Sequence, residues 1–566
     1  MTHMPLDPAA VQAIVTQHTS YWDGQRPRMR DYKALYMTNF WDRDNLDQRV
    51  KTEVARAFAT VESYIGALFA RNPAVLVTPD LRQHGNPEVA EATANQYLVS
   101  AREQIEDATR LALIFPASFI KMAPTVSIDP LKRVETSALP PWEVIVDSTA
   151  TSWDNQRWVG HIYLVPLEDA QARFKKDGWS HRTYTRWLDN DMPTNSAGGP
   201  KSESTTEMWV QIVEVFDLVA DKLLVWSPDW EGGKEFVFTG VKVQVGALEP
   251  GVNANTSKDD VTVEMVHETT GIPYRSAAGT PVVPILPLYY SRDPETPLRG
   301  YSLIARIYDQ LRDLNVLRTY QSNGVRRMAR QWLVLAGLLD PDAQSKIAEG
   351  VDGEFIEVSA PVETDLTGKI IPVPQQPIPA DIEQFAQQSE VDIQSAGVNA
   401  PFVSGSVTGV TATENRLLQE YTASQLGRMA RTRDALIADM ARVYNTMLSV
   451  ILGEDAEPLT LPNPIGPTML SADDLTGDFG YWAVDGGSTP MGDAVKRDNL
   501  LNLVPILQGL GAPAQTLLAE LVRVYDLPQS FTEAVEAAAE VPLDADPNAE
   551  DPNAEDPNAL PPEGQL

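Results

Sequence analysis

The chain has no cysteine among its 566 residues. Disulfide bridges and thiolate metal sites are therefore excluded, and the composition fits a protein that is assembled in a reducing cytoplasm. Histidine is also scarce, and the six histidines are scattered without the spacing of metal ligands. The sequence therefore predicts no metal site.

Positive charge is the second scarce feature. The chain has 45 Lys and Arg against 78 Asp and Glu, which gives a formal net charge of −33. Proteins that grip nucleic acid tightly use Lys and Arg to release counterions, whereas this chain as a whole repels phosphate. A tightly wrapped nucleic-acid complex is therefore disfavoured, and acidity that secures solubility is the simpler interpretation.

Signals for secretion or membrane insertion are missing from the sequence. Residues 1–21 contain His, Asp and Gln but no cationic start followed by an apolar run. Elsewhere no uncharged apolar run reaches the length of about 20 residues that a bilayer requires. We expect a soluble protein that makes no membrane contact.

Catalytic signatures are missing as well. The stretch Gly232-Gly-Lys234 lacks the spacing and the following hydroxyl of a phosphate-binding Walker motif. The stretch Gly405-Ser-Val-Thr-Gly409 lacks the Gly-x-Ser-x-Gly spacing of a nucleophile elbow. We predict no catalytic residue and no cofactor, and an enzyme with an unrecognised site remains as an alternative that nucleotide turnover would reveal.

The most informative feature that is present is an uncharged loop that runs into a very long helix. Thr411 and Glu414 stand in the relation of a capping box, and Gly453 provides a stop after Leu452. Apolar residues keep helical spacing between these signals, and no proline interrupts them. A helix of this length extends over roughly 60 Å, so it spans several units or serves as a strut in an assembly.

The first 298 residues mix helical and strand-like patterns. Helical spacing of apolar residues runs from Asp47 to Ala70, and a second helix is expected from Glu88 to Ala112. Runs of β-branched and aromatic residues then predict strands at 119–122, 142–147, 158–164, 209–216 and 222–226. Because 566 residues exceed what a single core supports, we expect several parts, with an α+β fold over 1–298 and a mainly helical core.

From residue 299 the sequence pattern becomes mainly helical, and five parts follow one another along the chain. An apolar stripe from Leu303 to Trp332 predicts a helix over 299–338. Glycines and prolines bracket short strands in the module that follows. The remaining parts are the module at 339–379, a short helix at 380–397, the uncharged loop at 398–410 and the long helix at 411–453.

The chain after the long helix has three parts. A proline-containing connection occupies 454–490, and helices are expected over 491–540. The last part, 541–566, repeats the pentad Asp-Pro-Asn-Ala-Glu. Because Pro breaks helices and ladders while the acids repel one another, we expect this tail to be disordered.

The order of parts resembles the portal protein, or head-to-tail connector, of short-tailed double-stranded DNA bacteriophages. The stretches that carry the likeness in the helical half are Gly300-Tyr-Ser-Leu, the Gly/Pro-rich module, Gly397-Val and Gly409-Val-Thr-Ala-Thr-Glu414. Earlier likenesses are Ala59-Thr-Val-Glu-Ser-Tyr-Ile-Gly66 with Asn72-Pro73, and Pro141-Trp-Glu-Val-Ile-Val-Asp147. Together they cover most of the chain.

The resemblance implies a ring of about twelve subunits at one capsid vertex, through which viral DNA is packaged and later ejected. The parts are then a wing (1–298), a first stem helix (299–338), a clip (339–379), a second stem helix (380–397), a tunnel loop (398–410), a long wing helix (411–453), a wing-to-crown connection (454–490), a crown (491–540) and the acidic tail. Implied partners are the terminase large subunit, the tail adaptor, the major capsid protein and the scaffold. The protein would lie in the virion after assembly in the host cytoplasm, and ATP hydrolysis would belong to a partner.

Candidate site residues follow from this placement. A conduit must let the polyanion slide, so acidic and neutral walls suit it. Glu383 and Glu390 are nearly in line on their helix, as are Asp381 and Asp392, and a channel-lining face and a solvated outer face remain equally open. The notable tunnel-loop side chains are Asn399, Phe402, Ser404, Ser406 and Thr408. No lysine occurs in that loop, which speaks against a phosphate ratchet there.

The arginines of the first stem helix form the last candidate set. We favour salt bridges between subunits over DNA contacts for Arg312, Arg318, Arg326, Arg327 and Arg330, because a ring of subunits that each carry −33 needs cross-subunit pairing. The alternative function is another oligomeric virion scaffold, or an internal or tail structural protein, without a closed channel.

Overall fold

The computed structural model describes residues 6–42, 51–69, 72–79, 84–125, 132–183, 186–189, 208–239, 241–244, 266–269, 271–276, 279–293, 300–328, 332–334, 341, 345, 370–372, 380–396, 412–452, 459–461 and 468–484. The chain divides into two units, residues 1–487 and 488–566. The expected helices at 491–540, the acidic tail and the uncharged loop lie outside the described residues. The described part is a mixed α+β fold, which confirms the predicted fold class at that level.

A six-stranded antiparallel sheet is formed by strands between residues 144 and 239. Its order is β4-β5-β7-β8-β9, with β6 paired to β7. The strands are β4 (Val144–Val146), β5 (Trp158–Pro166), β6 (Arg182–Thr183), β7 (Met208–Asp217), β8 (Lys222–Trp226) and β9 (Phe236–Thr239). The predicted strands at 142–147, 158–164, 209–216 and 222–226 are confirmed within one or two residues at most ends, because their β-branched and aromatic runs are long and clearly bounded.

A three-stranded antiparallel sheet packs against the six-stranded one. Its order is β12-β2-β3, from β2 (Ser118–Pro124), β3 (Val134–Leu139) and β12 (Ile285–Leu288). Phe119 and Ile285 share a buried cluster with Phe216 and Leu223 of the larger sheet. The two sheets therefore form a sandwich. Because successive strand residues point to opposite faces, Ile120 and Met122 pack away from it, in the main core.

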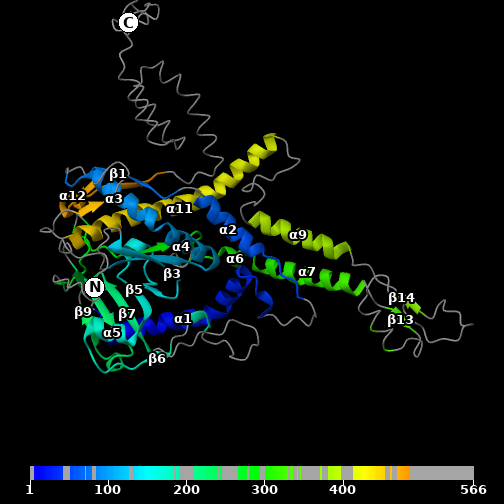
Figure 1. Cartoon of the computed structure of the whole chain (residues 1–566), viewed down its shortest axis with the longest axis horizontal. Helices are drawn as coiled ribbons and strands as arrows, with labels where there is room; N and C mark the ends of the chain where they lie inside the picture. The colour runs from blue at the N-terminus through cyan, green and yellow to red at the C-terminus, as the bar shows by residue number, and fades with distance from the viewer. Residues whose placement is uncertain are drawn as a thin grey trace, which may run out of the picture. The chain divides into compact units, whose positions relative to one another are not determined.

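Helices cover both outer faces of the sandwich (Figure 1). On one side α1 (Pro8–Tyr36) packs Val11 and Val15 against Val213 and Val215. On the other side the main core gathers α2 (Arg56–Leu68), α3 (Pro87–Ser100), α4 (Arg102–Ile114) and the last part of α11 (Ala412–Leu452). The sequence analysis missed α1, which has a proline inside it, at Pro27, and only a weak apolar stripe.

The long helix α11 runs from Ala412 to Leu452 and confirms the predicted helix of 411–453. At 1.5 Å per residue its 41 residues extend over about 60 Å. Tyr444 stacks on Tyr97 of α3 at a ring separation of 5.1 Å, and Asn445 Nδ2 donates to the carbonyl of Ala90. The segment Leu426–Leu452 is apolar and long enough to cross a membrane, but 61% of its most apolar stretch is buried inside the fold, as in the core helix of a soluble protein.

Sequence-distant strands join beside α11. Strand β1 (Val75–Thr78) pairs with β17 (Gly480–Ala483), and a capping box of Ser471 and Asp474 opens α12 (Ala472–Leu475). Thus part of the connection at 454–490 packs on α3 and α11. The other described elements are α5 (Leu167–Phe174), β10 (Val241–Gln244) paired with β11 (Val266–Thr269), and β15 (Leu459–Leu461) paired with β16 (Thr468–Leu470).

Two helix boundaries differ from the sequence expectations. The helix expected from Asp47 begins at Arg56, and residues 51–54 are not helical but hydrogen-bond to α7 (Tyr308–Met328) instead. The helix expected over 88–112 is two helices, because the chain leaves helical geometry at Ala101. No Gly or Pro marks that break, so the sequence carried no local signal for it.

Candidate functional site

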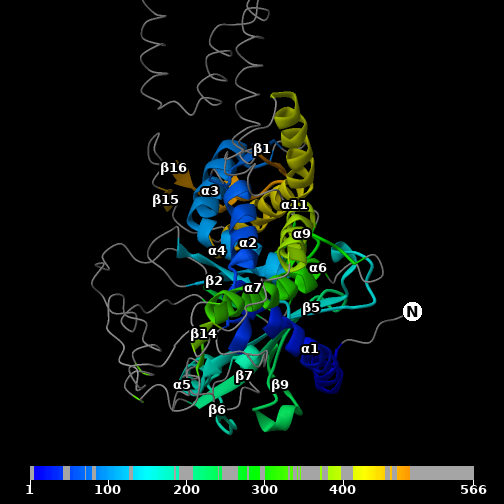
Figure 2. The same cartoon turned by 90° about the vertical axis from the view of Figure 1, so that its right-hand side faces the viewer.

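The helical half of the described chain is built around an arm, which we define as α6 (Leu303–Arg306), α7, β13 (Trp332–Val334), β14 (Ile370–Pro372) and α9 (Ala380–Ala396). Helices α7 and α9 pack against each other, and both views show them side by side (Figures 1 and 2). β13 and β14 pair antiparallel, with Leu333 opposite Ile371. The arm is therefore two helices joined through a small β module.

The first arm helix is shorter than predicted. The apolar stripe predicted one helix over 299–338, but α7 ends at Met328 and Trp332 lies in a strand. A short apolar run such as Trp-Leu-Val is compatible with the spacing of a helix and with that of a strand. Its pairing with Ile370–Pro372 makes it a strand. Strand β14 confirms one of the short strands expected in the module at 339–379, and most of that module lies outside the described residues.

Polar contacts fix the base of the arm to the end of α4 and to the segment before α2. Ser302 caps α6 by accepting from the amide of Ala305 and donates to the carbonyl of Ile114 at 2.6 Å. Further along, the side chain of Asn315 accepts from the amide of Val54 at 2.9 Å. Ile307, Leu311 and Leu314 are buried in the main core. The start of α7 is thus part of the core, while its later turns leave it.

The outer part of the arm exposes large apolar side chains. We define the arm apolar set as Tyr320 and Val325 of α7, which are 45% and 58% exposed, and Phe385 and Val391 of α9, which are 53% and 54% exposed. Ala386, Ser389 and Ile393 of α9 are buried, so the helix already has one packed face. Val325 belongs to the apolar stripe that the sequence analysis found from Leu303 to Trp332, and the other three residues were not singled out.

The four acidic candidates on α9 have different surroundings. Asp381 and Glu383 are exposed, and Asp392 is exposed and accepts from Gln388 at 3.0 Å. Glu390 is half-buried and forms an ion pair of 2.7 Å with Arg318 of α7. Arg318 therefore has a partner within its own chain, and the charge of Glu390 is balanced locally. Which face of α9 would line a channel stays a prediction.

The structure describes only some of the remaining candidates, which are arginines and tunnel-loop residues. Arg312 is exposed on α7, and Arg326 and Arg327 lie in its last turn. Arg330 lies outside the described residues, as do all five tunnel-loop candidates, Asn399, Phe402, Ser404, Ser406 and Thr408. Their predicted roles stay predictions.

A second polar feature lies inside the sandwich, and the sequence analysis missed it. We call it the Glu214 cluster: Lys121 of β2, His161 and Tyr163 of β5, Arg173 of α5 and Glu214 of β7. Glu214 receives Lys121 Nζ at 2.7 Å, the Tyr163 hydroxyl at 2.5 Å and Arg173 Nη2 at 3.2 Å. His161 lies directly opposite Glu214 across the β5–β7 pair, and its Nδ1 is 2.9 Å from Lys121 Nζ.

Burial and neighbouring charges perturb the cluster strongly. Burial alone would raise the pKa of Glu214, but the charges of Lys121 and Arg173 outweigh it and hold that pKa well below its usual range. Burial, and then the charge of Lys121, lower the pKa of His161, so the ring is neutral at pH 7. Burial and the Glu214 charge raise the pKa of Tyr163. The cluster thus holds two cations and one anion at neutral pH.

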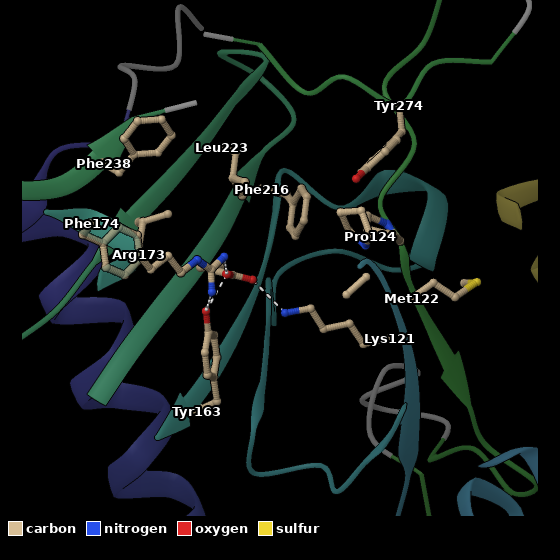
Figure 3. Close-up of a pocket in the computed structure, with 14 residues that line it drawn as sticks. Lys121, Met122, Pro124, Tyr163, Arg173, Phe174, Phe216, Leu223, Phe238 and Tyr274 are labelled. Carbon is tan, nitrogen blue, oxygen red and sulfur yellow. Dashed lines mark hydrogen bonds and ion pairs between the residues drawn. The ribbon is translucent and has the colours of Figure 1, made fainter. Parts of the chain in front are cut away.

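A cavity of about 410 Å³ adjoins the cluster (Figure 3). Lys121, Tyr163, Arg173 and Glu214 form its polar end. Phe216, Leu223, Val225, Phe174 and Phe238 contribute apolar wall, and Tyr274 and Pro284 line it from the chain before β12. Among the described residues, no group of His, Asp and Glu is arranged to hold a metal ion.

Comparisons with known proteins do not assign the chain to a family. No protein-family model matches it, and no curated protein matches its sequence either.

Proposed function

We propose that this chain is the subunit of a ring-shaped viral portal, the channel for packaging and ejection of double-stranded DNA. The observation that carries the proposal is the arm in its setting: two packed helices joined through a small β module, followed in sequence by a helix of 41 residues. The sequence resemblance assigns this order to stem, clip, stem and long wing helix. Support therefore comes from order and packing.

The arm apolar set supports assembly. Each large apolar side chain that moves from water into a contact contributes about 1.5–3 kcal/mol. Tyr320, Val325, Phe385 and Val391 lie on two neighbouring helices that already pack on each other, so a further partner is needed to bury them. In a closed ring one patch of each subunit meets a different patch of its neighbour, so the arm apolar set would supply one side of every interface.

The charges fit a conduit that does not hold its cargo. Asp381, Glu383 and Asp392 are exposed on α9, and we assign them to the wall of the channel, with the tunnel-loop residues at its constriction. Acidic walls repel phosphate and so do not brake a sliding polyanion. We assign Arg312, Arg326, Arg327 and Arg330 to contacts between subunits, and DNA passes without sequence-specific binding.

The proposal includes the setting of the ring. It would occupy one capsid vertex of a virion, beside the major capsid protein and the scaffold, and bind the terminase large subunit and later the tail adaptor. The chain itself would be no enzyme. A different oligomeric scaffold without a closed channel is the second candidate, and the same exposed apolar set serves it equally well.

Negative-stain microscopy and native mass spectrometry of the purified chain test the proposal. We expect closed rings of about twelve subunits with α9 near the axis. The double variant Phe385→Ser with Val391→Ser should keep its thermal unfolding midpoint and lose at least about tenfold in ring yield, because about 3 kcal/mol or more leaves each interface. Arg326→Glu should lower ring yield as well.

Val99→Ser is the matched control for these variants. Val99 is 49% exposed on α3, away from the arm, so ring yield should not change. Open or filamentous assemblies of the wild-type chain would favour the scaffold. A chain that stays monomeric, or rings that the double variant leaves intact, would overturn the role of the arm.

A further inference from the structure

The Glu214 cluster has more donors than acceptors. Lys121 and Arg173 bring two positive charges, and Glu214 is the single carboxylate among the described residues that line the cavity. Because Lys121 lies against Nδ1 of a neutral His161, the ring hydrogen of His161 is on Nε2, which is buried and finds no acceptor in the described part of the chain. A buried excess of cations and donors is costly unless an anion or water compensates it.

The excess charge is accessible from the cavity. Arg173 uses Nη1 for the Tyr163 hydroxyl and Nη2 for Glu214, and its side chain is still 55% exposed. A guanidinium has five N–H donors, so donors remain for a further acceptor. No described residue bonds the hydroxyl of Tyr274, which points towards the Phe216 side of the cavity (Figure 3).

The rest of the cavity is apolar. Phe216, Leu223 and Val225 come from the six-stranded sheet, and Phe174 and Phe238 close the side near Arg173 (Figure 3). At about 410 Å³ the cavity lies within the range of roughly 300–1,000 Å³ of small-molecule sites. The cavity thus has one polar end with a single surplus positive charge and one apolar end.

We propose that the sandwich cavity is a binding site for a small organic monocarboxylate with an apolar chain or ring, whose carboxylate meets Arg173 and Lys121. A monoanion balances the surplus charge, whereas a phosphate dianion would leave a net negative charge inside the sandwich. The net charge of −33 on the whole chain argues against unspecific attraction of anions. This inference does not depend on the proposed function, because the cavity lies within one chain.

Isothermal titration calorimetry of the full chain with octanoate tests the site, with octan-1-ol and octylammonium as matched probes. We expect one octanoate per chain, octan-1-ol at least about tenfold weaker, and no binding of octylammonium. Arg173→Gln leaves the Lys121–Glu214 pair in place and should weaken octanoate by about tenfold to a hundredfold, since a hydrogen bond to a charged group is worth about 1.5–3 kcal/mol. Its affinity for octan-1-ol should stay unchanged.

Two further variants sharpen the test. Ala123 lines the cavity from β2, so Ala123→Leu should reduce the binding of both octanoate and octan-1-ol. Arg182→Gln is the control: Arg182 is 43% exposed and pairs with Asp229 on the same sheet without lining the cavity, so octanoate affinity should not change. No octanoate binding, or equal affinity for octanoate and octan-1-ol in the wild type, would overturn the proposal whether or not Arg173→Gln folds.

Discussion

The sandwich and the arm differ in where their charged and apolar side chains lie. In the sandwich, Glu214 is buried with two cations and a hydroxyl around it, all from the same chain. In the arm, Asp381 and Glu383 are exposed, and so are Phe385 and Val391 of the same helix. The sandwich completes itself within one subunit, whereas the arm leaves surface for a partner. The comparison separates a folding unit from an assembly unit.

Energetics sharpen this difference. A buried ion pair adds little net stability when intact, because desolvation offsets attraction, but removal of one partner strands a buried charge. An exposed ion pair adds little stability when it forms, and its removal costs little stability. Substitutions in the sandwich should therefore act on unfolding, and substitutions in the outer arm should act on association.

Removal of Glu214 is expected to have the largest effect. Glu214→Ala leaves Lys121, whose side chain is only 12% exposed, without its carboxylate. We expect the free energy of unfolding to fall by about 3–5 kcal/mol, as for other broken buried pairs. Denaturant unfolding of the monomeric chain measures it. The control Glu383→Ala removes an exposed carboxylate and should cost less than about 0.5 kcal/mol, and equal losses would break the comparison.

The stability contributions of two glutamates in the sandwich region, the half-buried Glu143 and the buried Glu214, should respond to pH with opposite sign. Burial raises the pKa of Glu143 to about 7, and no cation pairs with it in the described part of the chain. The folded state thus binds this proton more tightly than the unfolded state, so the contribution of Glu143 to stability is present below pH 4.5 and lost as pH rises to 7. For Glu214, whose pKa is lowered, the contribution is present above pH 4.5 and lost in acid.

Glu143→Gln tests that assignment. The amide cannot ionise, so the variant should be more stable than the wild type at pH 8, by about 1–2 kcal/mol after allowance for partial exposure. The difference should vanish near pH 4, where the wild-type carboxyl is protonated. Thermal unfolding midpoints across pH 4–8 measure the effect. A variant that is less stable at pH 8 would show that the Glu143 carboxylate has a compensating partner.

The sequence predicted the parts that carry strong local signals. The capping-box pattern of Thr411 and Glu414 and the uninterrupted apolar spacing predicted α11, and β-branched runs predicted β5, β7 and β8. The Glu214 cluster was out of reach, because Lys121 and Glu214 meet only through the packing of two sheets over 93 residues of chain. The lone signal was a charged residue inside an otherwise apolar strand, Glu214 between Val213 and Val215.

Pairing inside the arm limits its predicted assembly role, and a double-mutant cycle measures by how much. Arg318 and Glu390 are 39% and 34% exposed and 2.7 Å apart, so their coupling should lie at about 0.2–1 kcal/mol. The cycle uses Arg318→Ala, Glu390→Ala and both together, with unfolding followed at protein concentrations that keep the chain monomeric. If the monomer shows this coupling and ring yield is unchanged, Arg318 acts within its subunit. If coupling appears only in the assembled ring, Arg318 exchanges Glu390 for a partner on the neighbouring subunit. The charged residues of the arm, like its exposed apolar residues, would then serve association.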